Sequence, residues 1–447
     1  MRRAATSFAA AVGLALFLAV LGVPRSGLAE NAGTGPGDGI AARNGKAGTM
    51  AELARMYDSG PCASCHREIY DQWRTSAHGT SIFGGGKTAA ALQAAVLDGL
   101  MRWPASGVKS EKDVTVTHLM GCAKCHLPQM ADAEDAVARE TVAAIAAWRS
   151  ALDNKDAAAT ARAAEKLEAL NIGCLICHNR NAITHKWTDG YPKAGELYGG
   201  REGAHPGPAY SVLRKSPIMG ESIFCGQCHA LGPNLELDNP TQCSSVYGSY
   251  LYTYKAEGGP ETCQDCHMRK GRLGHATAAP GGGKDAVDVA VDARGFQWRD
   301  GSHYVPRVAV DVAMTNKAGH SLPGSISTQK RLVLEVTARD DDGATVFSGS
   351  KTYAPLAQRF GRGVRTGYGP YEKTGIIEDT ALPANRTIRE KFDILLEPRE
   401  PGPQDGNRSA RNVTVDVTLK LVDSGTAPAV STTWRTATEV VKLENVR

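Results

Sequence analysis

The sequence predicts an α + β protein of two domains, a loop- and helix-rich domain with repeated cysteine motifs followed by a β-sandwich of immunoglobulin-like type. Three observations predict this fold class. The motif C-x-x-C-H occurs five times between residues 62 and 267. After residue 280 the chain has no cysteine, and short β-branched runs alternate with polar residues. The proline- and glycine-rich segment 280–283 separates the two regions, so we expect domains at 50–280 and 281–447.

The beginning of the chain has the features of an export leader. Two arginines precede an apolar run from Phe8 to Val23, and small residues at 27–29 form a cleavage site. We expect residues 1–29 to be a signal peptide and residues 30–49 to be a flexible leader. Two glycines interrupt the apolar run, which favours cleavage over a retained anchor. The mature chain is therefore predicted not to span a membrane.

Each C-x-x-C-H motif is the attachment signature of a c-type haem. Two cysteines on one turn add to the porphyrin vinyl groups as thioethers, and the adjacent histidine faces the iron as its proximal ligand. The predicted attachment residues are Cys62, Cys65, Cys122, Cys125, Cys174, Cys177, Cys225, Cys228, Cys263 and Cys266. The predicted proximal ligands are His66, His126, His178, His229 and His267. We therefore expect five covalently attached haem c groups, each with its iron.

Zinc is the alternative metal for such motifs, because C-x-x-C also supplies two thiolates to a tetrahedral site. A zinc site needs no histidine directly after the second cysteine, yet all five copies have one. A disulfide framework is disfavoured because ten of the 11 cysteines fall in these regular pairs. The remaining one, Cys243, is either a buried thiol or half of an intermolecular disulfide.

Seven histidines outside the motifs are candidates for the distal axial positions, with a surface or capping role as the alternative for each. Those that we expect to bind iron are His78, His118, His185, His205, His275 and His320, and the seventh is His303. Nine methionines exist as substitutes, but most lie at helix or strand spacing and suit the core better.

Chain geometry limits which iron each of these histidines can reach. A helix from His66 to His78 would separate them by about 18 Å, whereas two axial nitrogens of one iron are about 4 Å apart. His78 is therefore expected to reach a neighbouring haem, and His118 meets the same objection if its stretch is helical. His185 and His275 follow their motifs through loops, so their own haem and a neighbouring haem both remain open.

Periodicity predicts a few regular elements before residue 280. Residues 67–77 form a helix with Ile69, Tyr70 and Trp73 on one face. Residues 131–152 and 155–170 form a helical hairpin, either a strut that covers haem faces or an ordinary solvent-facing pair.

Six segments after residue 280 read as strands. They are Val287–Val291, Val308–Met314, Leu332–Ala338, Ala344–Phe347, Val413–Val422 and Ser431–Val441. The sequence DDDG at 340–343 is predicted to be a hairpin turn, with a calcium site as the alternative. His320 lies in a Gly/Pro loop of this region (AGHSLPG), which could bring it to a haem of its own chain or of the next subunit.

The motif segments resemble the multihaem cytochrome c superfamily. The resemblance rests on CASCHREIYDQWRTSAHG, on FCGQCHALGPN and on CQDCHMRKGRLGH, and it covers residues 60–280. This superfamily includes tetrahaem electron shuttles, hydroxylamine oxidoreductases, pentahaem nitrite reductases and extracellular filament cytochromes. The resemblance implies that His78 and His275 are distal ligands. The tail segment NKAGHSLPG is similar to tails of some surface and filament cytochromes, which makes His320 a further candidate.

Two departures from the pattern bear on activity. The nitrite reductases of this superfamily have lysine in place of the motif histidine at the catalytic haem, whereas all five positions here are histidine. The hydroxylamine oxidoreductases carry eight haems.

The sequence therefore favours an electron carrier over an enzyme. A bis-histidine iron has no open position for a substrate. The alternative is a reductase or oxidase of a small nitrogen or sulfur compound with one open haem. We expect redox proteins or an extracellular acceptor as partners in the periplasm or at the cell surface, and an oligomer or filament built through the β domain is a further hypothesis. Lys and Arg are scattered rather than clustered, which argues against nucleic acid.

Overall fold

The computed structural model describes the chain from residue 45 to residue 444 with several gaps. The gaps are residues 85–86, 184–189, 194, 208–209, 230–245, 279, 302, 325–329, 360–372, 398–409 and 424–428. The described residues fall in one unit that spans Pro36–Arg447. The predicted signal peptide and most of the flexible leader lie outside the described residues, as do Cys243 and His185.

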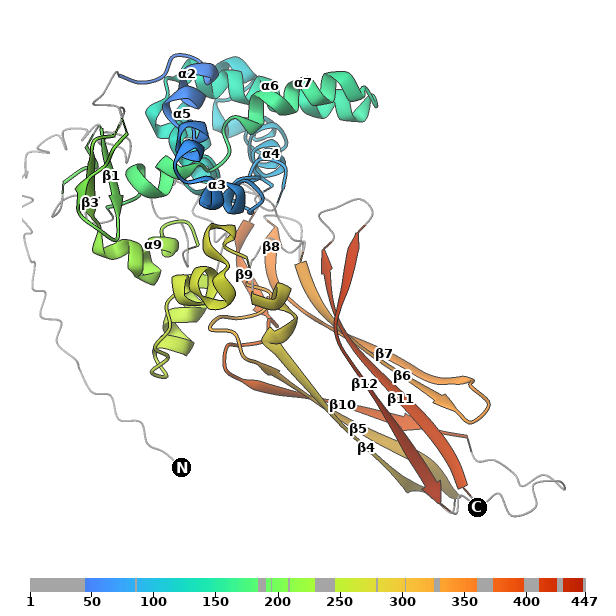
Figure 1. The fold of residues 1–447 in the computed structure, drawn as a ribbon. Coiled ribbons are helices and arrows are strands. Elements are labelled where there is room, and N and C mark those ends of the chain that lie inside the picture. The colour runs from blue at the N-terminus through green and yellow to red at the C-terminus, as the bar shows by residue number, and fades with distance from the viewer. Residues whose placement is uncertain are drawn as a thin grey trace, which may run out of the picture. The chain divides into compact units, whose positions relative to one another are not determined.

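Short helices and single turns form most of the chain before residue 280 (Figure 1). The α-helices are α2 (Met50–Met56), α3 (Arg67–Arg74), α4 (Thr88–Leu92), α5 (Val116–His126), α6 (Asp135–Asp153), α7 (Ala157–Glu168), α9 (Ser222–Gly226) and α10 (Val246–Ser249). The shorter turns are η1 (Gly60–Ser64), η2 (Gln93–Leu97), η3 (Leu100–Arg102), η4 (Pro104–Ser106), η5 (Glu111–Asp113), η6 (Pro128–Asp132), η7 (Ile176–Arg180), η8 (Pro217–Gly220), η9 (Tyr250–Lys255), η10 (Asp265–Arg269), η11 (Lys270–Arg272), η12 (Gly274–Ala276) and η13 (Pro280–Ala286).

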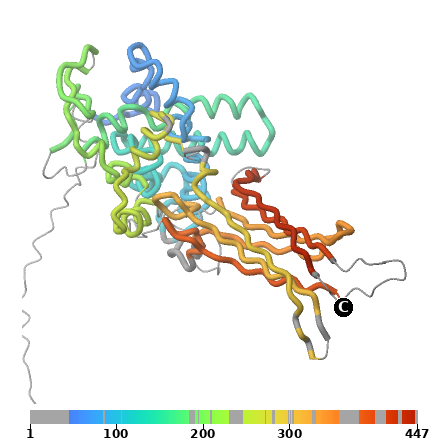
Figure 2. The backbone as a smooth tube through the Cα atoms, turned by 60° about the horizontal axis from the view of Figure 1, so that its bottom comes forward, coloured from blue at the N-terminus to red at the C-terminus, as the bar shows by residue number. Residues whose placement is uncertain are grey.

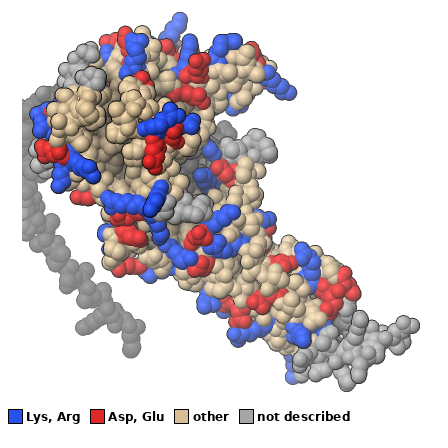
Figure 3. All heavy atoms as spheres, in the orientation of Figure 1, with Lys and Arg blue, Asp and Glu red and all other residues tan. Residues whose placement is uncertain are grey.

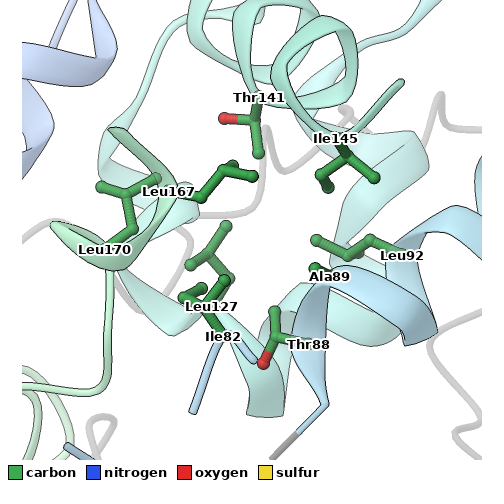
Figure 4. A pocket seen from close by; sticks show the side chains of 9 residues that line it. All are labelled: Ile82, Thr88, Ala89, Leu92, Leu127, Thr141, Ile145, Leu167 and Leu170. Atoms are coloured by element: carbon green, nitrogen blue, oxygen red, sulfur yellow. The ribbon is translucent and has the colours of Figure 1, made fainter. Parts of the chain in front are cut away.

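The predicted helical hairpin is confirmed as α6 and α7. The side chain of Asp156 caps α7 by accepting a hydrogen bond from the Ala159 amide. Thr141 and Ile145 of α6 and Leu167 of α7 converge with apolar residues of α4 and its neighbours, as Figure 4 shows. This face is buried, so the hairpin is part of the core of the helical region along this stretch. Leu152 near its tip is 47% exposed, as expected of a hairpin whose end faces solvent.

A small sheet within the helical region has no counterpart in the predicted elements. Its strands are β1 (Glu196–Gly199), β2 (Gly203–Ala204) and β3 (Val212–Lys215). β3 lies in the middle, parallel to β1 and antiparallel to β2. Strands this short carry almost no periodic signal, so the pairing depends on contacts that the sequence pattern does not reveal.

After residue 286 the described chain consists mainly of long antiparallel strands, and Figure 2 shows them running side by side. They are β4 (Val287–Asp300), β5 (His303–Asn316), β6 (Lys330–Asp340), β7 (Thr345–Tyr353), β8 (Pro355–Arg359), β9 (Lys373–Asp379), β10 (Thr387–Leu395), β11 (Ala410–Asp423) and β12 (Val430–Glu444). All six predicted strands are present, most of them longer than predicted, whereas β8, β9 and β10 were not predicted.

Two of the sheets share one apolar core. One sheet has the order β10-β5-β4 and the other the order β12-β11-β6-β7, while β8 and β9 pair separately. Alternate residues of β6, from Leu332 to Ala338, are buried against residues of both sheets, as period-2 alternation requires. The turn predicted at 340–343 is confirmed. Asp340 accepts hydrogen bonds from the amides of Asp342 and Ala344, and Gly343 has a φ of 77°.

Within the described residues, no helix combines the length and apolar character needed to cross a bilayer. Figure 3 shows Lys and Arg residues interspersed with Asp and Glu over the visible face. On this face, charges of the two signs alternate rather than separate into patches.

Candidate haem centres

Local backbone hydrogen bonds fold the motifs into tight turns. In the first motif the His66 amide donates to the Cys62 carbonyl at 2.9 Å, and in the fourth His229 donates to Cys225 at the same distance. One turn of helix places residues four apart on the same side. Both cysteines and the histidine of a motif can therefore reach one porphyrin.

Four of the five motif histidines face a histidine from outside the motifs. The ring centroids are 6.3 Å apart for His66 and His205, 6.2 Å for His78 and His229, 6.1 Å for His178 and His275, and 6.2 Å for His267 and His320. In three pairs the ring planes are nearly parallel, with interplanar angles of 25°, 26° and 15°, and in the pair of His78 and His229 the planes cross at 71°.

This spacing is too wide for ring stacking and fits a metal ion held between two imidazoles. Two iron–nitrogen bonds of about 2 Å place the ring nitrogens about 4 Å apart. Each ring centroid lies about 1 Å behind its nitrogen, which gives a centroid separation of about 6 Å. Four similar separations in one chain therefore match bis-histidine ligation. The described residues contain no other cluster of three or more His, Cys, Asp or Glu that could hold a metal.

Hydrogen bonds to backbone carbonyls orient four of these rings. The Nδ1 atoms of His178 and His205 lie 2.8 Å from the carbonyl oxygens of Tyr198 and Tyr210. Those of His267 and His320 face carbonyl oxygens at 3.1 and 3.0 Å. A carbonyl only accepts, so Nδ1 carries the proton and Nε2 is left free to bind iron.

The small sheet of the helical region places two of these rings. Tyr198 lies in β1 and accepts the hydrogen bond from His178. His205 directly follows β2, and its amide donates to the Ser211 carbonyl at 2.9 Å. The short strands thus fix one proximal and one distal candidate.

Burial keeps several of the rings neutral. Removal from water lowers the pKa of His78, His178, His275 and His320, and it lowers that of His229 to about 4. Four further histidines, among them His126 and His267, contribute to the low pKa of His229 through their charges. Metal ions bind the neutral form of imidazole, so these environments suit ligation.

The second motif lies at the end of α5, where His126 Nδ1 is 3.5 Å from the Thr88 hydroxyl. His118 belongs to the same helix, so it cannot reach the opposite side of its own iron. Its ring instead takes a capping role, with Nδ1 accepting from the Thr115 amide at 3.1 Å. His185, a further predicted ligand, and the side chain of His303 lie outside the described residues.

The motifs also approach one another through their cysteines. Thiol contacts join Cys62 to Cys174 and Cys225 to Cys263. Another thiol contact joins Cys125 to Cys228. The first motif is thus next to the third, and the fourth is next to both the second and the fifth.

His320 comes from the β-rich region and is held from both sides. The buried side chain of Asn316, at the end of β5, donates to the carbonyl oxygens of His320 at 3.0 Å and Leu382 at 2.9 Å. The Ser321 amide donates to the Ser249 hydroxyl of α10 at 3.0 Å. The loop therefore joins the β-rich region to the ring of His267.

No protein-family model matches the chain, and no curated protein matches it. Among solved structures, the chain is similar to a penta-haem cytochrome c552 from Thermochromatium tepidum, with 18% sequence identity and a TM-score of 0.53. The match covers 87% of this chain and 99% of that chain. The chain has the fold of a pentahaem cytochrome c.

Two other solved structures resemble it too little to carry an argument. A structural-genomics target has 10% identity and a TM-score of 0.20, and the match covers 35% of this chain and 87% of that chain. A putative β-galactosidase from Bacteroides fragilis has 12% identity and a TM-score of 0.19 over 35% of this chain and 18% of that chain.

Proposed function

We propose that this protein is a pentahaem c-type cytochrome that carries single electrons. Four histidine pairs spaced for an iron between them carry this proposal. Haem iron supplies a one-electron couple, and a histidine on each face leaves no position for a substrate. The chain's own residues hold the rings, fix their tautomers and exclude water.

The contacts between motifs support a relay. We number the haems by the order of their motifs along the chain. Haems 1 and 3 are attached at adjacent cysteines, and haem 4 is attached beside haems 2 and 5. Cys177 lies close to both cysteines of the fourth motif, which supports haems 3 and 4 as neighbours. Electrons can therefore pass from haem 1 through haem 3 to haem 4, and from haem 4 to haem 2 or haem 5.

We propose His185 as the distal ligand of haem 2. Of the candidates outside the motifs, His78, His205, His275 and His320 already face other motif histidines. His118 caps its own helix, and His303 begins β5 in the β-rich region, whereas His185 follows the third motif by seven residues. Replacement of His185 by alanine is then expected to convert one haem, and only one, to the high-spin form.

The export leader and the attached haems support a location in the periplasm or at the cell surface, with redox proteins or an extracellular acceptor as partners. We further propose that the β-rich region is an immunoglobulin-like sandwich. The strands β4, β5 and β10 form one sheet, and β6, β7, β11 and β12 form the other. In a constant-type immunoglobulin domain the fourth strand, here β7, belongs to the first of these sheets instead. Assembly through this region remains a hypothesis, which concentration-dependent oligomers in solution would support.

Spin state separates the carrier from the alternative enzyme. The ferric holoprotein should show only low-spin haem in absorption and EPR spectra, and nitrite, cyanide and hydroxylamine should leave the spectra unchanged. A high-spin component that one of these additives converts would overturn the carrier. It would assign the protein to reductases or oxidases of that class of compound.

A further inference from the structure

The hydrogen bonds behind the ligand rings differ from one histidine pair to the next. At haem 5 both rings face a backbone carbonyl oxygen. His267 Nδ1 lies 3.1 Å from the Ala278 oxygen, and His320 Nδ1 lies 3.0 Å from the Ser321 oxygen.

Among the described residues, haems 1 and 3 each have one such contact. His205 Nδ1 lies 2.8 Å from the Tyr210 oxygen and 3.3 Å from the Gly207 amide nitrogen, and the shorter contact with a carbonyl requires the proton on Nδ1. His178 Nδ1 lies 2.8 Å from the Tyr198 oxygen.

Haem 4 has a weaker acceptor. His78 Nδ1 lies 3.3 Å from the hydroxyl of Thr277, which follows η12 with a φ of 46°. In the part of the chain that the structure describes, no carbonyl oxygen accepts from the rings of His78 or His229. A hydroxyl can turn its proton away from the ring or toward it, so it fixes the ring less firmly than a carbonyl.

An acceptor behind a ligand ring makes the iron-binding nitrogen more basic. A more basic ligand stabilises the ferric form over the ferrous form and lowers the reduction potential, which is one of the ways a protein tunes haem. The carboxylate of Glu261 acts in the same direction at haem 5, because its Oε2 lies 3.8 Å from Cys266 Sγ. The neighbouring carboxylate of Asp265 is paired with Arg269, so its charge is largely offset.

We propose that the potentials of these four haems follow the number of carbonyl acceptors, with haem 5 lowest, haems 1 and 3 between, and haem 4 highest. The proposal rests on the electron-carrier function and adds the direction of flow. Electrons that enter at haem 5 or haem 1 run downhill to the junction at haem 4. Thr277 is then a positioning residue that acts on the iron through His78.

Substitution of Thr277 tests this with changes of opposite sign. Thr277→Val removes the acceptor and should raise the potential of one haem. Thr277→Asn supplies an amide carbonyl, in a residue that tolerates positive φ, and should lower the potential of that same haem. Thr277→Ser keeps the hydroxyl and should restore the original value. We expect a threefold to tenfold change in the reduction equilibrium constant, and tenfold corresponds to about 59 mV for one electron.

A second substitution identifies haem 5. His320→Met replaces an imidazole that faces a carbonyl with a thioether, and methionine ligation raises haem potentials. Spectroelectrochemical titration of the full-length holoprotein should then show one component moving upward. The haem whose potential shifts in this variant should have a lower wild-type potential than the haem whose potential shifts in the Thr277 variants. Thr160→Val in α7, where the hydroxyl donates to the Asp156 carbonyl at 2.7 Å, is the matched control and should move none.

The proposed order is overturned if the haem that responds to the Thr277 substitutions has a lower wild-type potential than the haem that responds to His320→Met. It is also overturned if Thr277→Val and Thr277→Asn move no component or move it in the same direction, while haem content and the low-spin spectrum are intact. Either result leaves the carrier function standing, because that function is tested by spin state and ligand binding rather than by the order of potentials.

Discussion

The buried pair of Arg180 and Asp132 shows what one residue contributes between the haem motifs. Both side chains are almost fully enclosed, and Asp132 also accepts a hydrogen bond from Tyr57. Arg180 follows the third motif by two residues, Asp132 lies beyond the second, and Tyr57 precedes the first. The three side chains thus tie together the flanks of three motifs.

Loss of one charge from this pair should strongly destabilise the fold. Asp132→Asn leaves the guanidinium of Arg180 buried without a counter-charge, which costs about 3–5 kcal/mol of unfolding free energy. Asp153→Asn is the matched control, because Asp153 forms an exposed i,i+4 pair with Arg149, and we expect less than about 0.5 kcal/mol there. Denaturant unfolding of the two holoproteins measures the difference. Equal losses would show that the buried pair does not hold the motifs together.

Tyr57 should make stability depend on pH in the alkaline range. Burial raises its pKa well above the ordinary value of 10.0, so the folded state favours the neutral phenol. The stability that this phenol contributes is present below pH ~10 and is lost as the pH rises further toward the folded-state pKa.

The free energy of unfolding of Tyr57→Phe should therefore fall less than that of the wild-type protein between about pH 8 and about pH 11. Denaturant midpoints at the two pH values measure this dependence of stability on pH, the pH slope. Tyr252→Phe, at a position 73% exposed, should keep the wild-type slope. An unchanged slope in Tyr57→Phe would contradict the account.

The sequence predicts which residues are candidate ligands, but it does not predict most of their pairings. The motif cysteines and histidines stand at fixed spacing, and the expected helix length was enough to separate His78 from His66; its ring faces that of His229. The partners of His66 and His178 could not be predicted, because His205 and His275 reach them only through the packing of distant turns. His118 had the right residue type, but its ring is used as a helix cap.

At the level of elements, the loop that follows β5 positions His320, the proposed distal ligand of haem 5. Asn316→Ala removes the amide that binds the carbonyls of His320 and Leu382, so His320 should leave the iron more readily. Added cyanide should then convert one haem of five, which EPR and absorption titration would detect. Asn154→Ala, at the exposed end of α6, should behave as wild type. Cyanide resistance in Asn316→Ala would mean that the loop does not need this anchor.

Elements with strong periodicity were predictable and short or interrupted ones were not. The α6–α7 hairpin has an apolar stripe, and β6 alternates over its whole length. The strands β1, β2 and β3 are two to four residues long among glycines and prolines, and tertiary contacts alone select their pairing. β10 carries alternating charges, and its place in the sheet comes from the register with β5.

At the level of the whole molecule, the proposed electron relay includes a haem whose second ligand comes from the β-rich region. His320, supplied from that region, faces His267 of the fifth motif. The ion pair between Lys87 and Asp423 at 3.0 Å is a second link between the two regions. In the proposed assembly, the β-rich region therefore contributes one axial ligand.

Intact-mass spectrometry of the exported protein, combined with iron and zinc analysis, decides whether five haems are covalently attached to one chain. We expect the mass of the mature chain plus five haems, five iron atoms per chain and no zinc. A chain that carries zinc at the C-x-x-C pairs, or fewer than five haems after complete maturation, would contradict this expectation.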